Sequence, residues 1–314
     1  MNASMMSLDT LKDSNLTIIN NQAWFIPIDI LLIICLTLAI ILAMIFLFIV
    51  FIDSSCQTVA MILIANSCFS GLSLAVALLW STIVTFHNDL NQIQYQDATC
   101  IMRAYFIYVT FAALCYSLLL QAIYRYIIVI YPNRLSWQSK QRQLFLICLS
   151  WIFVFLYAVP VLLKGDIRYE VDDQICQMPL HLAVITVYNS ICVYFVPVSG
   201  IIFIYVKIVL YVKEMGKNVT TANSLFRAQR ELKMVHRIGI LISILLGLGV
   251  PYASFLFMGF FTSPPKYHYR IAYIFIDISL VFVIITLFKF TDPIKLAIRK
   301  RINRRTNVIA TIMT

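Results

Sequence analysis

Seven long apolar segments follow one another along this chain of 314 residues, and they constrain its fold more than any other feature. A helix needs roughly 20 mostly apolar residues to cross a hydrocarbon core of about 30 Å, and each segment meets that length. A helix also satisfies its own backbone polar groups, as the bilayer requires. The predicted spans are Phe25–Ile52, Thr58–Phe86, Ala98–Tyr131, Leu144–Leu163, Leu182–Tyr211, Ile238–Phe261 and Ile271–Thr291.

The charge content agrees with a membrane protein. Charged residues make up only 12% of the chain, against about 25% in soluble domains, and so few charges could not cover the aqueous surface of a soluble protein this size. No Pro/Gly/Ser-rich linker interrupts the spans, so we expect one all-α bundle over residues 25–293. Residues 1–24 form a polar N-terminal segment, and residues 294–314 a short amphipathic eighth helix and tail.

The lysines and arginines are distributed unequally between the two ends of the spans. With the N-terminus outside, seventeen lie on the inner side and six on the outer side, and Lys289 lies within the seventh span. Cytoplasmic loops carry the excess of Lys and Arg, so this orientation is predicted. The net charge of +10 then reflects topology, and nucleic-acid binding is not expected. The glycosylation sequons at Asn2 and Asn15 would lie outside.

Two of the eight cysteines, Cys100 and Cys176, lie at the predicted outer surface. A disulfide persists on that oxidising side, and a bridge here would fix the second outer loop to the top of the third span. Two free thiols are the alternative. The other six cysteines lie in or beside apolar spans, where Cys behaves as a small hydrophobe.

Several landmarks resemble the rhodopsin-like G protein-coupled receptors. Arg125, within Tyr124-Arg125-Tyr126, follows Cys100 by twenty-five residues, where that family places Asp-Arg-Tyr at the inner end of helix three. Over residues 25–305 the resemblance implies a plasma-membrane receptor that passes an extracellular signal to a heterotrimeric G protein by movement of helix six. The other landmarks are Pro132, Trp151, Pro160, Pro197, Tyr205, Pro251, Tyr252, Asp292 and Pro293.

The inner end of the third span carries the expected switch. A charged residue near the inner membrane face is costly and usually functional, which singles out Arg125. In the resembled family an acid at the base of helix six holds this arginine at rest, and Glu231 stands at that position. Tyr124 replaces the acid that normally precedes the arginine, so Glu231 would be the main restraint. A solvated glutamate in a basic loop is the alternative. The basic third inner loop and tail suit a G protein surface and also anionic lipid headgroups.

Other positions depart from the family pattern. Gly71 and Leu114 replace the polar residues of the family's sodium site, so no sodium is expected there. Leu248-Gly249 precedes Pro251 in place of Cys-Trp, and Leu296 replaces the tyrosine of the Asn-Pro-x-x-Tyr motif. The helix-six movement would therefore use different contacts. A signalling receptor and a non-signalling decoy both stay open at this point.

The seventh span contains Lys289 and Asp292, three residues apart on one helix face. The two side chains either pair within the membrane, or Lys289 extends its long stem toward the cytosol. The pair is the feature that favours a transporter or channel, whereas the odd span count and the lack of an internal repeat favour a receptor. Thr286 stands where opsins carry their lysine, so retinal is not expected. The chain contains no catalytic, metal-binding or cofactor-binding motif, and we expect none of these functions.

The resemblance places the ligand pocket between the outer halves of helices three, five, six and seven. Ile107 stands where amine receptors carry an aspartate, so a monoamine is not expected. The second outer loop is mildly acidic, which would suit a cationic peptide through steering, although a solvated loop is the alternative. The residues implied in the pocket are Arg103, Ile107, Tyr108, Phe111, Tyr252, Phe255, Asp277 and Val281.

Overall fold

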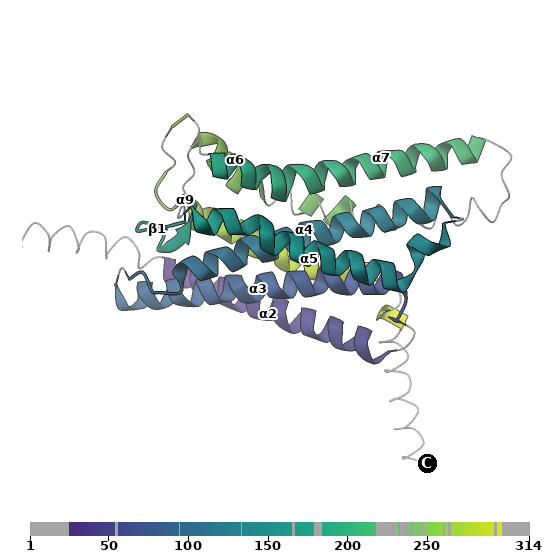
Figure 1. The fold of residues 1–314 in the computed structure, drawn as a ribbon. Helices are drawn as coiled ribbons and strands as arrows, with labels where there is room; N and C mark the ends of the chain where they lie inside the picture. The colour runs from purple at the N-terminus through teal and green to yellow at the C-terminus, as the bar shows by residue number, and fades with distance from the viewer. Residues whose placement is uncertain are drawn as a thin grey trace, which may run out of the picture.

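The computed structural model describes residues 25–53, 56–93, 95–132, 134–164, 167–178, 184–217, 265–291 and 294–296, together with shorter stretches between 232 and 262. The described elements run along one bundle (Figure 1). In chain order they are α2 (Ile26–Ile52), α3 (Val59–Asn91), α4 (Cys100–Ile130), η3 (Leu135–Gln138), α5 (Lys140–Leu163), β1 (Arg168–Glu170), β2 (Ile175–Gln177), α6 (Val184–Ser190), η4 (Ile191–Phe195), α7 (Val196–Lys217) and α9 (His268–Phe290).

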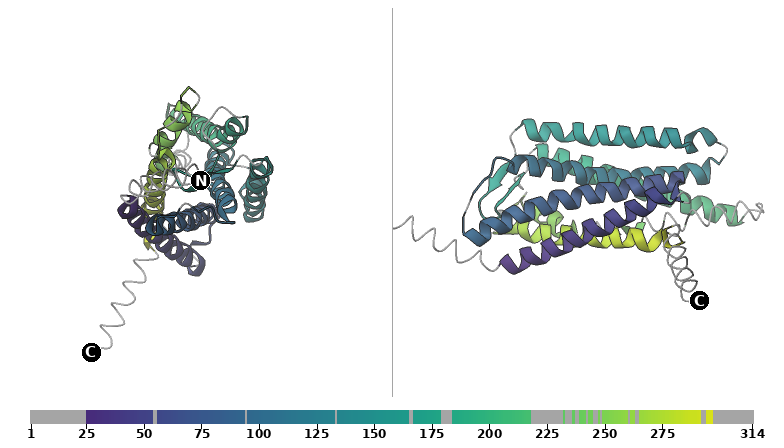
Figure 2. Two further views of the ribbon diagram at one scale, coloured as in Figure 1. Left: turned by 90° about the vertical axis from the view of Figure 1, so that its left-hand side faces the viewer. Right: turned by 90° about the horizontal axis from the view of Figure 1, so that it is seen from below.

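The architecture is the predicted all-α membrane bundle. Within the described residues, six helical stretches are long and apolar enough to cross a membrane, and they coincide with six of the seven predicted spans. The remaining span, the sixth, is described in part and includes the apolar helix Gly249–Met258. Two further views show the long helices side by side, seen end-on and along their length (Figure 2). Their outward faces carry exposed apolar side chains such as Phe48, Leu156 and Phe203, as lipid contact requires.

The helix ends follow ordinary capping chemistry. The Thr58 hydroxyl accepts a hydrogen bond from the Met61 backbone N–H at 3.3 Å at the start of α3, and Ser139 caps α5 in the same way. The apolar run that defined the predicted span stops at Phe86. α3 itself continues for one more, mostly polar, turn to Asn91. Its C-cap is Gln92, whose φ of 55° is the left-handed conformation common after helices.

α4 is the central helix of the bundle. Its described neighbours include α3, α5, α7 and the outer strands, and residues along most of its length are buried, among them Leu114 and Leu118. α2 and α3 pack closely through small residues, and the Cys68 Sγ donates to the Ala43 carbonyl at 3.7 Å. Small residues let membrane helices approach one another closely. The core therefore surrounds α4.

The second outer loop forms a two-stranded antiparallel hairpin, β1–β2, at the end of the bundle where α2 begins (Figure 1). Tyr169 pairs with Cys176 across the hairpin. The predicted disulfide is confirmed, because Cys100 and Cys176 are bonded with their Cα atoms 5.6 Å apart. β2 is buried along its whole length. The bridge therefore holds the hairpin over the outer end of α4.

Loss of one interhelical hydrogen bond should destabilise the bundle measurably. The Trp151 Nε1–H donates to the Asn66 Oδ1 at 3.0 Å, joining α5 to α3. Trp151→Phe removes the donor and leaves the Asn66 amide oxygen without it, so we expect the free energy of unfolding to fall by about 1–2 kcal/mol. Thermal unfolding of the purified protein in detergent measures this change. Trp137→Phe, at a partly exposed ring in η3, is the control, and an equal loss in both variants would contradict the prediction.

Candidate functional site

A cavity of about 250 Å³ lies among α3, α4, β2, α6, η4, the helix Gly249–Met258 and α9. Four of the predicted pocket residues line it: Ile107, Tyr108 and Phe111 from α4, and Tyr252 from the sixth span. The remaining described lining is mostly aliphatic and aromatic, with a few uncharged polar groups. The position agrees with the region that the sequence implied.

Four other predicted pocket residues lie elsewhere. Arg103 is at the outer end of α4 and pairs with Asp97. Phe255 packs with Ile175 and Tyr269, and Val281 packs against the main core. Asp277 lines a separate, smaller cavity. None of these four residues is in the lining of the larger cavity.

Hydrogen bonds between tyrosines and the hairpin close one side of the cavity. The Tyr108 hydroxyl donates to the Gln177 Oε1, and the Gln177 Nε2 donates to the Tyr273 hydroxyl at 2.8 Å. The Met178 backbone N–H donates to the Tyr108 hydroxyl at 3.3 Å, and Tyr269 donates to the Met178 carbonyl. The described hydrogen bonds that join β2 to α4 and α9 therefore involve neutral groups.

The fifth span contains a π-helical turn, η4, that faces the cavity. It ends two residues before Pro197, which lacks a backbone N–H and so disturbs the hydrogen-bond ladder. Such bulges occur often at functional sites. η4 places Val193 and Tyr194 in the cavity wall, and the Tyr194 ring lies 5.5 Å from that of Phe111. A Cβ at Gly249 would lie 2.9 Å from the Tyr194 hydroxyl oxygen, so glycine is what allows this tyrosine to approach the sixth span.

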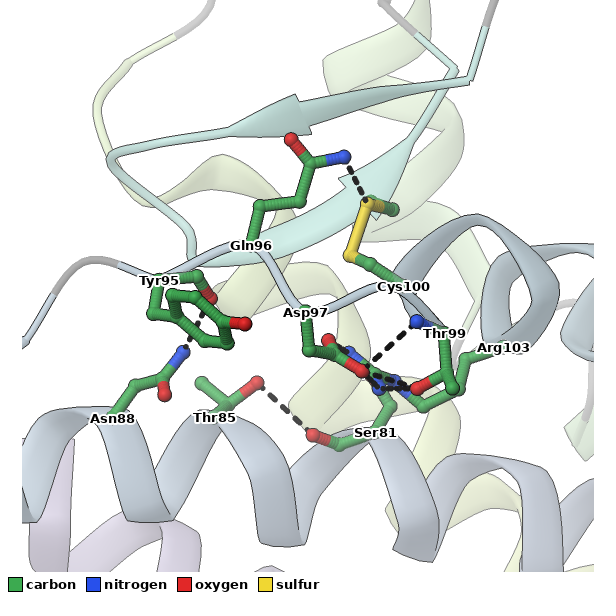
Figure 3. Close-up of polar contacts among 10 residues, drawn as sticks. Ser81, Thr85, Asn88, Tyr95, Gln96, Asp97, Thr99, Cys100 and Arg103 are labelled. Atoms are coloured by element: carbon green, nitrogen blue, oxygen red, sulfur yellow. Dashed lines mark hydrogen bonds and ion pairs between the residues drawn. A yellow bond between two sulfur atoms is a disulfide. The ribbon is translucent and has the colours of Figure 1, made fainter.

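An ion pair closes the outer end of α4 (Figure 3). Both terminal nitrogens of Arg103 donate to the Asp97 carboxylate at 2.7 Å, and the Thr99 backbone N–H donates to the same group at 3.1 Å. These hydrogen bonds, led by that from Arg103, lower the pKa of Asp97 to about 2. The guanidinium also lies 5.7 Å from the Trp80 ring centroid. Arg103 is thus matched by an acid and turned away from the cavity.

Arg270, at the start of α9, is the centre of a second and larger cluster. Its Nη2 donates to the Asp89 Oδ1 at 3.0 Å, and its Nη1 donates to the other oxygen. Its Nε donates to the Asp173 carbonyl at 3.0 Å, and its Cζ lies 4.7 Å from the Phe25 ring centroid. The Gln174 Nε2 also donates to Asp89, at 2.8 Å. The cluster joins the first, second and seventh spans to the hairpin turn.

A small cavity of about 40 Å³ adjoins this cluster. Asp277 is buried in its wall, and its Oδ1 has no hydrogen-bond partner among the described residues. Asp29 lines the same cavity, with its Oδ2 3.9 Å from the Arg270 Nη1. Asp173 lies in the turn of the hairpin, where burial raises its pKa even though the Arg270 backbone N–H donates to it. The acidic second outer loop therefore has at least one of its carboxylates, that of Asp173, buried inside the protein.

The inner half of the bundle holds the predicted switch residues. Arg125 is 6% exposed at the inner end of α4, with its Cζ 5.7 Å from the Tyr124 ring centroid. Tyr126 and Tyr205 pack against the main core. Among the family landmarks, Trp151 joins α3, Pro197 is buried in α7, and Pro251 lies in the described helix of the sixth span.

Several predictions fall on residues outside the described ranges. They concern Glu231, Asp292, Pro293, the sequons at Asn2 and Asn15, and the amphipathic tail beyond Leu296. Lys289 is described and exposed on the outside of the bundle, as extension of its stem toward the inner interface requires.

Sequence reasoning missed the acids that hold Arg270 and several polar residues of the cavity wall, among them Gln177 and Tyr194. Asp29 and Asp89 could have been found, because a carboxylate within an apolar helix needs a partner. Gln177 could have been inferred from its position beside Cys176, whose disulfide fixes the strand over α4. Tyr194 gives no comparable signal, because its role depends on the π turn and on the space at Gly249.

Breaking the buried ion pair of Arg270 with Asp89 should lower the free energy of unfolding more than breaking the pair of Arg103 with Asp97 at the outer end of α4. Asp89→Asn leaves the Arg270 guanidinium, 6% exposed, without its closest counter-ion, and such a loss typically costs about 3–5 kcal/mol. We expect a large fall in thermal stability and in surface expression. Asp97→Asn serves as the comparison, because the Asp97 side chain is 24% exposed and such a pair contributes roughly 1 kcal/mol. Equal losses of thermal stability in the two variants would show that burial does not determine the cost of breaking an ion pair.

The pair of Asp97 with Arg103 should also respond to acid. The pKa of Asp97 is lowered from 3.8 to about 2 in the folded protein, so its contribution to stability is fully present above pH 3.8 and is lost as the pH falls toward 2. The difference in thermal stability between the wild type and Asp97→Asn should therefore be constant from pH 7 down to about 4 and shrink below it. A difference that persists unchanged below this window would contradict the assignment.

Comparison with known proteins agrees with the geometry. The family model described as 7 transmembrane receptor (rhodopsin family) matches residues 29–294. The crystal structure of squid rhodopsin has a similar fold, with a TM-score of 0.70 and 18% sequence identity over 89% of this chain and 85% of that one. A search of curated protein sequences gives no significant match. With a multi-pass bundle, an outer disulfide and a family match over most of its length, the chain belongs to the rhodopsin family of seven-transmembrane receptors.

Proposed function

We propose that this plasma-membrane protein binds an extracellular ligand in the cavity of about 250 Å³ and transmits binding to a heterotrimeric G protein at its inner face. The observation that carries the proposal is the arrangement of α4, which lines the cavity through Phe111 and holds Arg125 buried at its inner end. Fourteen residues separate the two, which is about 21 Å along a helix. One rigid element therefore reaches both proposed sites.

The sixth span supports the transmission step. Its described helix contributes Tyr252, Ala253 and Leu256 to the cavity wall, and Pro251 at its start is a site where a helix bends readily. Gly249 lies against the Tyr194 hydroxyl on the fifth span. A ligand that moves Tyr194 or Tyr252 would change the contact between these two helices. This contact would replace the one that the family makes through its tryptophan.

On the inner side, the proposal makes Glu231 the restraint on Arg125. An arginine–carboxylate pair at about 4 Å is worth up to ~4 kcal/mol at an effective dielectric near 20, before desolvation is subtracted. Even half of that would shift an equilibrium between resting and active states by a factor of tens. Tyr124, which replaces the usual neighbouring acid, has no carboxylate and so cannot form the same ion pair with Arg125.

Removing the charge of Glu231 should raise signalling in the absence of ligand. We expect Glu231→Gln to increase basal G protein activation by about ten-fold, since 1.4 kcal/mol corresponds to a factor of ten. Glu214→Gln is the matched control, because Glu214 is an exposed acid on the inner part of α7. Second-messenger assays on cells with equal surface expression measure the effect. Unchanged basal activity in Glu231→Gln would contradict the restraint.

Arg125→Ala in the same cells separates a receptor from a decoy. It should lose signalling with and without Glu231→Gln while its surface expression is kept. Equal signalling by the wild type and Arg125→Ala would contradict the role of Arg125, whereas no signalling by the wild type would leave a non-signalling decoy as the better description. The cationic peptide suggested by the sequence is one ligand class for such a screen, although burial of Asp173 reduces the acidic surface that would attract it.

A further inference from the structure

We propose that the cavity takes a small, uncharged and mainly apolar molecule that carries one oxygen able to form hydrogen bonds. This inference rests on the proposed function only in placing the ligand in this cavity. Its first support is the wall itself. The described lining contains no Asp, Glu, Lys, Arg or His, and its polar members are tyrosines, Ser190 and two amides, Gln177 and Asn189.

The charged residues of the surrounding spans face elsewhere. Arg103 pairs with Asp97, Arg270 pairs with Asp89, and Asp277 lines the smaller cavity. The sixth span cannot add a charge, because residues 238–261 include no Asp, Glu, Lys, Arg or His. A ligand with a net charge would therefore lose its hydration in the cavity without gaining a counter-ion, which is strongly unfavourable.

The volume sets the size of the ligand. A closed apolar cavity of about 150 Å³ accepts benzene, and sites for drug-sized ligands start near 300 Å³. At about 250 Å³, this cavity fits a molecule of about two fused rings with a short substituent. A peptide side chain could enter, but a folded or extended peptide could not be enclosed.

Three polar groups are available to such a ligand. The Gln177 amide is not one of them, because its oxygen accepts from Tyr108 and its nitrogen donates to Tyr273. The Asn189 Oδ1 accepts a weak bond from Tyr157 at 3.4 Å, but no described residue accepts a hydrogen bond from its Nδ2. The hydroxyls of Tyr194 and Tyr252 likewise show no hydrogen bond to a described residue. Asn189, Tyr194 and Tyr252 can therefore serve a carbonyl or hydroxyl oxygen on the ligand.

The test uses four probes with one ring system: a naphthyl methyl ketone, a naphthyl alcohol, naphthoate and naphthylmethylammonium. Binding to the purified full-length receptor in lipid nanodiscs is measured by calorimetry and by thermal stabilisation, without a G protein. We expect the ketone or the alcohol to bind, and the two ions to bind about 100-fold more weakly because they are desolvated without a partner. Tighter binding of either ion or of a basic peptide, or no binding by both neutral probes, would overturn the proposal.

Two pairs of variants assign the binding to this cavity. Val193→Trp fills it and should abolish binding of the neutral probes, whereas Ile191→Trp, at a residue on the same turn that is 46% exposed, should leave binding unchanged. Equal binding by both variants would overturn the assignment. Asn189→Asp adds a carboxylate to the wall and should raise the affinity for naphthylmethylammonium by about 10-fold or more, while Asn189→Leu should not.

Binding and signalling can fail separately. Neutral probes that bind but never change Arg125-dependent signalling, whether as agonists or as competitors, would contradict the proposed function and leave the ligand class intact. Arg125-dependent signalling by a basic peptide, with no binding of the neutral probes, would overturn the ligand class and leave the receptor function intact.

Discussion

The outer half of this receptor depends on the ion pair between Arg270 and Asp89. Both residues are almost fully buried, and both carboxylate oxygens accept from the guanidinium. A buried pair contributes little net stability but is costly to break, so its effect is to fix which elements lie together. Arg270 also donates to the hairpin turn at the Asp173 carbonyl, while the disulfide holds β2 to α4. The hairpin is thus held both at its turn and through β2.

This fastening determines the chemistry of the cavity. With the hairpin in place, Gln177 bridges Tyr108 and Tyr273 with neutral hydrogen bonds. At the outer rim, Arg103 and Arg270 are paired with Asp97 and Asp89, so neither serves as a counter-ion in the cavity wall. A low-dielectric space without fixed charges discriminates against ions by desolvation. Selectivity for an uncharged ligand therefore follows from where the charges are paired, and it needs no repulsive group in the wall.

The spans and the disulfide could be predicted from sequence because lipid imposes a length and a composition on each helix, and because only two cysteines lie on the oxidising side. The rotation of each helix about its own axis could not be predicted from the sequence. Arg103 and Asp277 were expected in the pocket, yet Arg103 turns to an aspartate six residues earlier in the chain and Asp277 faces the first and second spans. Helix faces are set by packing against several neighbours at once, and an apolar span shows little periodicity from which to read them. Glu231 remains a prediction, since it lies outside the described residues.

Gly249 stands where the family carries a tryptophan in the sixth span, and a tyrosine of the fifth span occupies the space beside it. A π turn before Pro197 rotates Tyr194 into the bundle, and its hydroxyl occupies the space beside Gly249 where a larger residue could not fit. The same ring contacts Phe111 on α4, the helix that carries Arg125. One tyrosine therefore touches the cavity, the sixth span and the central helix. In the proposed function, the contact between the fifth and sixth spans is therefore made by a tyrosine of the fifth span, while the sixth supplies only a glycine.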